Sequence, residues 1–126
     1  MKKSKLSKKI KKEWENLLFN LIFVILAIVI IILFNSNTTL TTILEMILGI
    51  VGLIKWKSKR TLAIFIVAGI FGTIAEMIVI YTSQTWIYAF PTFMQLVPIW
   101  LFAVWANAGA FIYETSKEIH KLGVNK

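Results

Sequence analysis

The chain has 126 residues, of which 58% are hydrophobic, and its mean hydropathy is +0.77. This composition is too apolar for an ordinary water-soluble domain or a disordered chain, and the length allows one domain at most. The sequence contains no cysteine and one histidine, His120, which excludes disulfides, thiolate catalysis and histidine-cluster metal sites. We therefore expect neither a metal nor a cofactor.

Four apolar segments follow one another, at residues 17–34, 38–54, 62–81 and 96–113. A helix needs about 20 residues, with a range of about 17–25, to cross the roughly 30 Å core of a bilayer. The second segment reaches that length only with its leading threonines. The first segment is too long for a signal peptide and lacks a small-residue cleavage site. The prediction is an all-α, integral membrane four-helix bundle over residues 17–113.

The basic residues predict the orientation of this bundle. All 14 Lys and Arg residues lie before the first segment, between the second and third, or after the fourth. Four spans put these regions on one side, and the positive-inside rule makes that side cytoplasmic. We expect a multi-pass protein of the cell (inner or plasma) membrane with both termini in the cytoplasm. The net charge of +8 is then explained by interaction with the lipid bilayer, and we expect no binding of nucleic acid.

The two ends of the chain are predicted to be cytoplasmic tails. In residues 1–16, Leu6, Ile10 and Trp14 recur at helical spacing among lysines. This basic segment is either an amphipathic helix on an anionic leaflet or a solvated tail that only fixes orientation. Residues 114–126 continue the fourth segment as a helical extension with Glu–Lys spacings typical of a surface.

Glu45 and Glu76 are the candidate catalytic or proton-handling residues, because an ionisable group within a membrane span is costly and usually functional. Each shares a helix face with two glycines, which favour close packing: Gly49 and Gly52, and Gly69 and Gly72. If these faces meet in an antiparallel pair, the two carboxyl groups share a proton or a cation site. The alternative is that Glu45 reaches water at the interface and Glu76 bonds a neighbouring hydroxyl.

The uncharged linker at residues 82–95 is rich in aromatic residues and is expected to fold onto the membrane surface or to cap the bundle. It predicts either an outer aromatic belt or a pocket beside Glu76, lined by Trp86, Tyr88, Gln95 and Trp100. In the fourth segment, a small-residue face comprises Ala103, Ala106 and Ala110. Asn107 lies beside this face, and it either joins helices or binds a ligand.

Residues 69–114 carry a Glu late in a helix, then W-x-Y, then V-P-x-W and a second Trp. This pattern resembles small bacterial inner-membrane proteins of unknown function and, distantly, the membrane carotenoid hydratases and lycopene cyclases. The shared residues are Glu76, Trp86, Tyr88, Pro98, Trp100 and Trp105. The second resemblance implies a membrane carboxylic acid that donates a proton to a polyene.

Three functions follow as hypotheses. The first is a small polytopic protein that binds or moves a small solute or a proton with its intramembrane Glu residues. Four short helices enclose little space, so we expect a homo-oligomer or a membrane partner. The second is an isoprenoid- or lipid-modifying enzyme with Glu76 as general acid. The third is an accessory structural subunit of a larger membrane complex. The sequence leaves open whether the chain is an enzyme.

Overall fold

The computed structural model describes residues 2–123, and within them the side chains of Lys5 and of residues 7–123. It is all-α, as predicted, with four helices: α1 (Lys2–Phe34), α2 (Thr38–Trp56), α3 (Lys59–Ser83) and α4 (Trp100–Lys121). Residues 124–126 of the predicted C-terminal tail and the side chain of Leu6 lie outside the described part.

Short polar turns separate the first three helices. Asn37 caps α2 by accepting a hydrogen bond from the Leu40 amide at 3.1 Å, and Ser58 caps α3 by accepting one from the Thr61 amide at 3.2 Å. Lys57 ends α2 in the left-handed conformation, with φ at 52°, which turns the chain directly into α3. The 35–37 turn brings α1 and α2 together as antiparallel neighbours, whereas α3 diverges from α2 after the 57–58 turn and packs on α4.

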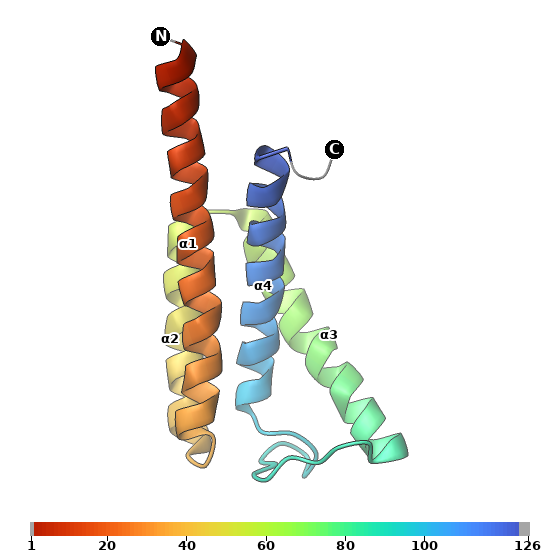
Figure 1. Cartoon of the computed structure of the whole chain (residues 1–126). Coiled ribbons are helices and arrows are strands. Elements are labelled where there is room, and N and C mark those ends of the chain that lie inside the picture. The colour runs from red at the N-terminus through yellow and green to blue at the C-terminus, as the bar shows by residue number, and fades with distance from the viewer. Residues whose placement is uncertain (1, 124–126) are drawn as a thin grey trace.

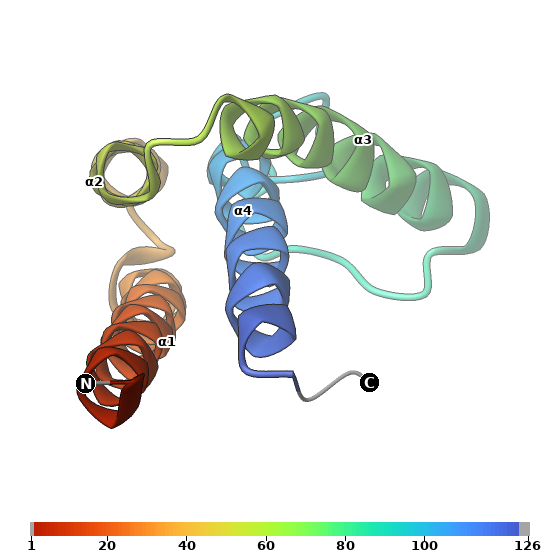
Figure 2. The ribbon, with the colours of Figure 1, turned by 90° about the horizontal axis from the view of Figure 1, so that it is seen from above.

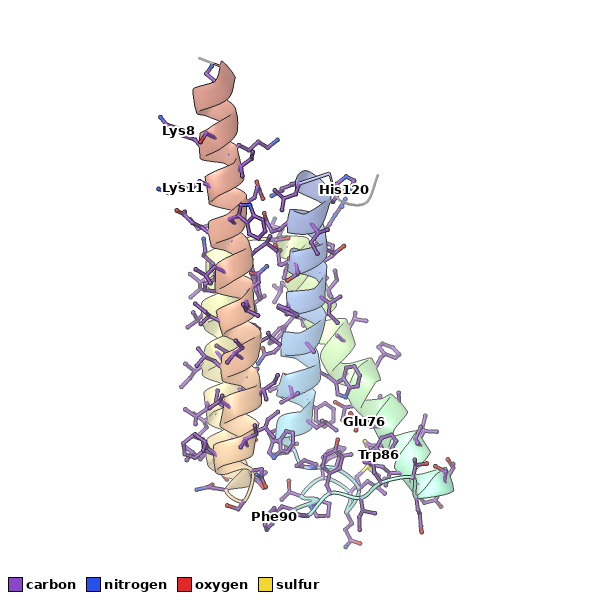
Figure 3. The ribbon with its side chains drawn as sticks, viewed as in Figure 1. Lys8, Lys11, Glu76, Trp86, Phe90 and His120 are labelled. Atoms are coloured by element: carbon purple, nitrogen blue, oxygen red, sulfur yellow. The ribbon has the colours of Figure 1, made fainter. Side chains whose placement is uncertain are left out.

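The helices run alternately down and up, so both ends of the chain lie at the same end of the molecule as the 57–58 turn (Figure 1). We call this the basic end, because Lys8, Lys11 and His120 lie there (Figure 3). The opposite end, the loop end, holds the 35–37 turn and the 84–99 loop, which contain no charged residue. The structure therefore puts the basic regions at one end of the molecule and the uncharged loops at the other.

Helix α1 combines the predicted 1–16 tail and the first apolar segment in one continuous helix, which extends past the other helices at the basic end (Figure 1). Trp14 is 61% exposed and Ile10 is 41% exposed, whereas Glu13 is buried. Ile10 and Trp14 are thus exposed in the part of the chain that the structure describes. The interfacial and solvated interpretations of the tail both stay predictions.

Helix α4 lies between the α1–α2 pair and α3 when the molecule is seen from above (Figure 2). It packs most extensively on α3 and also contacts α2 and α1, whereas α2 and α3 barely touch each other. It has eight buried residues: Trp100, Leu101, Ala103, Ala106, Asn107, Ala110, Glu114 and Glu118. The other three helices are therefore arranged around α4.

Three helices are long and apolar enough to cross a membrane: α1 from Ser7 onward, α2 and α3. Their large outward-facing side chains are unpartnered, as at Ile32, Ile54 and Phe71, each about two-thirds exposed. Helix α4 is not among the three. It begins at Trp100 rather than at the predicted residue 96, because a turn closed by a 2.8 Å hydrogen bond from the Phe93 amide to the Val97 carbonyl precedes it.

The glycine faces of α2 and α3 do not pack against each other as the antiparallel pairing required. A Cβ added at Gly69 would press on the Phe102 carbonyl and Ala106 of α4, and one at Gly72 would overlap the ring of Trp105. On α2, a Cβ at Gly49 would press on Asn107 of α4 and on Phe65, while one at Gly52 would meet Phe23 of α1 and Trp56. The two glycines of α3 therefore lie against α4, and those of α2 lie against side chains from all four helices.

Candidate functional site

Glu76 is the centre of a hydrogen-bonded cluster between α3, α4 and the 84–99 loop. Its Oε1 accepts a hydrogen bond from the Tyr88 hydroxyl at 2.5 Å, and its Oε2 accepts one from the Trp105 indole nitrogen at 2.5 Å. Figure 3 shows Glu76 on the side of α3 that faces α4. Both carboxylate oxygens are thus held by neutral aromatic donors.

Gly72 explains why Trp105 reaches this carboxylate. Gly72 and Glu76 lie one helical turn apart on the same face of α3. Because Gly72 has no side chain, the Trp105 ring occupies the space over that turn, where any Cβ would collide with it. The indole N–H then points along the helix face to Glu76.

Tyr88 is half-buried, and its ring meets Trp100 edge-on at a centroid distance of 6.1 Å and an angle of 90°. Burial raises the pKa of the Tyr88 phenol above its usual value, and the hydrogen bond to Glu76 and the charge of Glu76 raise it further, while Trp86 opposes the shift. The phenol therefore stays protonated at neutral pH and remains a donor to Glu76.

A cavity of about 330 Å³ adjoins the cluster. Its polar and aromatic wall comprises Glu76, Tyr88, Trp100 and Trp105, and Ile31 of α1 also lines it. A second cavity of about 200 Å³ shares Ile31, Tyr88 and Trp100 with it. Because α1 and α3 do not pack on each other, the larger cavity lies in the gap between them on the surface of α4.

Two features of this cavity are electrostatically unusual. No Lys, Arg or His of residues 5–123 forms an ion pair with Glu76. The indole nitrogen of Trp100, a residue only 6% exposed, is buried without a hydrogen-bond partner in the described structure. A carboxylate without a counter-charge and an aromatic wall suit a positively charged guest, through Coulomb and cation–π attraction.

Glu45 has different surroundings. It is fully buried on α2, and the Asn107 side-chain amide donates to its Oε1 at 3.1 Å and to its backbone carbonyl at 3.0 Å. The Glu45 Oε2 and Asn107 Oδ1 atoms have no partner among the described residues. This is a polar contact between two tightly packed helices, with Gly49 leaving the room for Asn107.

The two glutamates lie on opposite sides of α4. Their partners Trp105 and Asn107 are two positions apart, which is about 3 Å along the helix but about 200° around it. The condition for a shared proton, that the two carboxyl groups meet, is not fulfilled within one chain.

The predicted pocket residues are only partly brought together. Tyr88 and Trp100 line the cavity with Glu76, whereas Trp86 and Gln95 are exposed outside it and Asn107 belongs to the Glu45 contact. Trp105, a direct partner of Glu76, was not among the predicted ligand-binding residues. The sequence feature that could have indicated Trp105 is Gly72, because a glycine one turn from a membrane Glu leaves space for a large side chain beside the carboxyl group.

No family model matches the chain, and no curated protein or solved structure is significantly similar to it. The resemblance of residues 69–114 to bacterial inner-membrane proteins and carotenoid enzymes therefore stays a prediction.

Proposed function

We propose that this chain is a four-span membrane protein that binds a small, largely apolar organic cation at Glu76. The cation is an amine or quaternary ammonium that partitions into the bilayer. The observation that carries the proposal is a carboxylate in the wall of an aromatic cavity, with no cationic partner among the described side chains.

The membrane setting is supported by the three apolar helices and their exposed aliphatic surfaces. Helix α4 crosses with them, because a helix enclosed by others does not have to match lipid in hydropathy. Three of its polar residues, Asn107, Glu114 and Glu118, are buried in the protein. The basic end is cytoplasmic by the positive-inside rule.

The route to the site is lateral. The cavity lies between α1 and α3, two helices that do not pack together, so a guest dissolved in the bilayer enters between them. Tyr88 and Trp100 of the cavity wall belong to the loop end, so the site lies in the outer half of the membrane in the proposed orientation. Pocket volumes of about 300–1,000 Å³ are typical for small ligands, so this site is at the small end of the range.

Hydrogen bonding favours binding over acid catalysis. Both oxygens of Glu76 accept hydrogen bonds, which holds the carboxylate as an acceptor. A proton donor to a polyene would have to release at least one of these contacts first. The arrangement therefore supports the solute-binding hypothesis more directly than the isoprenoid-enzyme hypothesis.

The test compares benzyltrimethylammonium with its neutral carbon isostere, neopentylbenzene, by calorimetric titration of the full chain in phosphatidylcholine nanodiscs. We expect the cation to bind at least about tenfold more tightly than the isostere, because the carboxylate and the aromatic rings act on charge. Glu76→Gln should remove that preference. Glu45→Gln is the matched control and should keep it, since Glu45 lies on the other side of α4.

Equal binding of the two compounds would show that charge is not recognised. A preference that survives Glu76→Gln would place the site elsewhere. Either result overturns the proposal.

A further inference from the structure

Another cavity lies at the basic end, at the opposite end of the molecule from the two cavities near Glu76 and Tyr88. It has a volume of about 340 Å³ and is enclosed by α1, α4 and the end of α2. Five lysines line it: Lys12, Lys55, Lys57, Lys117 and Lys121. Two acidic residues, Glu114 and Glu118, also line it, so the wall carries an excess of three positive charges over seven charged groups.

The two acidic residues already have partners. Lys117 pairs with Glu114 at 3.2 Å, and Lys121 pairs with Glu118 at 3.4 Å. Glu114 also accepts a hydrogen bond from the Thr61 hydroxyl, and Glu118 accepts one from the Asn16 amide at 3.4 Å. Each acid thus has one lysine partner on α4, and the Oε2 atom of Glu118 is buried without a hydrogen-bond partner among the described residues.

Three lysines have no acidic partner in the part of the chain that the structure describes: Lys12, Lys55 and Lys57. The Lys55 ammonium donates to Asn16 Oδ1 at 3.5 Å and lies 5.8 Å from the centre of the Phe19 ring, so it is held toward the cavity. The buried carboxyl group of Glu13 is adjacent to Lys12 in the sequence but does not line the cavity.

The uncharged polar side chains of the cavity wall form hydrogen bonds with one another and with a neighbouring threonine. The Trp56 indole donates to Asn20 Oδ1 at 2.9 Å, and the Asn20 amide donates to the Thr115 hydroxyl at 3.2 Å. Asn20 is 1% exposed. Because these groups satisfy one another, a guest is held by the ammonium groups rather than by the amides.

The cavity lies where the apolar part of α1 begins. Residues Lys12 and Asn16 precede the apolar run that starts at Leu17, and Phe19 and Asn20 follow its start. In a bilayer this is the level of the lipid headgroups, where indole side chains such as Trp56 are also enriched. Lysines at this level attract anionic phosphates, each contributing about 1 kcal/mol.

We propose that the basic-end cavity binds a phosphate group, with Lys12, Lys55 and Lys57 as the residues that hold it. The group belongs to an anionic lipid headgroup or to a free phosphate anion. The two sources share this chemistry and differ in whether an acyl chain accompanies it. The proposal does not depend on the Glu76 site.

The experiment uses the full chain in phosphatidylcholine nanodiscs, with two arms. In the first, phosphatidylglycerol is added in steps and its retention on the protein is counted by native mass spectrometry. In the second, inorganic phosphate is added and the rise in unfolding temperature is measured. Lipid retention without stabilisation by phosphate assigns a headgroup site, and the reverse assigns a free-anion site.

Two variants with equal charge loss decide whether the cavity is responsible. Replacing Lys12, Lys55 and Lys57 with Gln should weaken binding by about fivefold for each lysine removed. The matched control replaces the exposed Lys8, Lys9 and Lys59 and should bind as the wild type does. Replacing the three cavity lysines with Arg keeps the charge and should retain binding. Equal losses in the Gln variant and the control, or no binding in either arm, would overturn the proposal.

Discussion

At the scale of single residues, two glutamates in adjacent helices have different chemical settings. Glu76 holds a neutral donor on each oxygen at the edge of a cavity, whereas Glu45 is sealed between helices with one oxygen unpartnered. The difference comes from what faces them on α4: an indole beside a cavity in one case and an amide in close packing in the other. The same residue type thus lines a cavity at one position and joins two helices at the other.

The Tyr88 phenol should make the stability of the protein sensitive to alkaline pH. Its pKa is higher in the folded chain than in the unfolded chain, because burial and Glu76 oppose its ionisation. The unfolded state therefore releases this proton first as the pH rises. The contribution to stability is complete below about pH 10 and is lost progressively above it.

This is measured as the thermal unfolding midpoint in detergent micelles across a series of pH values. Tyr88→Phe should be less stable than the wild type at neutral pH, since it loses the hydrogen bond to Glu76, and should decline less between neutral and alkaline pH. Tyr81→Phe, which removes a phenol from a residue that is 76% exposed, should follow the wild type. Parallel curves for the wild type and Tyr88→Phe would contradict the linkage.

Residue-level reasoning from the sequence found the carboxyl group but only part of its environment. The cost of a charge within an apolar segment marks Glu76 without any knowledge of neighbours, and proximity in sequence brings in Tyr88. Trp105 reaches Glu76 from 29 positions away along the chain, through a helix contact that depends on which face of α4 meets α3. Periodicity does not determine that face when nearly every residue is apolar.

At the scale of helices, α4 is the one described helix that is not apolar enough to count as a candidate span, yet it has the most buried positions. Hydropathy reflects how well a helix tolerates contact with lipid. It therefore identifies α1, α2 and α3, whose outer faces are not covered by other helices in the described structure. It could not show that α4 separates α2 from α3, because a polar residue in a span indicates only that a protein neighbour exists. The expected pairing of glycine faces failed for this reason.

The contact between Asn107 and Glu45 should stabilise the packing of α4 against α2. Asn107→Leu removes the donor to a fully buried carboxyl group and should cost about 1–3 kcal/mol of unfolding free energy. The double variant Glu45→Met, Asn107→Leu replaces both polar groups with apolar ones of similar size. It should be more stable than the single variant, since no polar atom is then left unpaired.

Unfolding in mixed micelles by a denaturing detergent measures both free energies. An additive loss, with the double variant less stable than Asn107→Leu alone, would show that the two side chains are not coupled. Binding of benzyltrimethylammonium should be retained in the double variant, because neither residue lines the Glu76 cavity.

At the scale of the whole molecule, charge and chemistry are divided between two ends. The basic end carries lysines around one cavity, and the uncharged loop end carries aromatic rings and a carboxylate around another. Chain order explains the division, since the antiparallel helices bring alternate connections to the same end (Figure 1). The cation proposed for the loop end and the phosphate group proposed for the basic end would therefore lie in opposite leaflets of the membrane.

This division requires that all four helices cross the membrane, which cysteine labelling tests directly. The natural chain has no cysteine, so each single substitution gives one unique thiol. Ser36→Cys and Thr85→Cys are exposed positions at the loop end, and Lys59→Cys and Ser116→Cys are exposed positions at the basic end. A membrane-impermeant maleimide applied to intact host cells should label the first two, and should label the second two only after permeabilisation.

Labelling of Ser116→Cys from outside would mean that α4 does not cross. Labelling of Lys59→Cys from outside would contradict the predicted orientation. The basic-end cavity would then face the leaflet poor in anionic lipid, which would count against the proposed phosphate site.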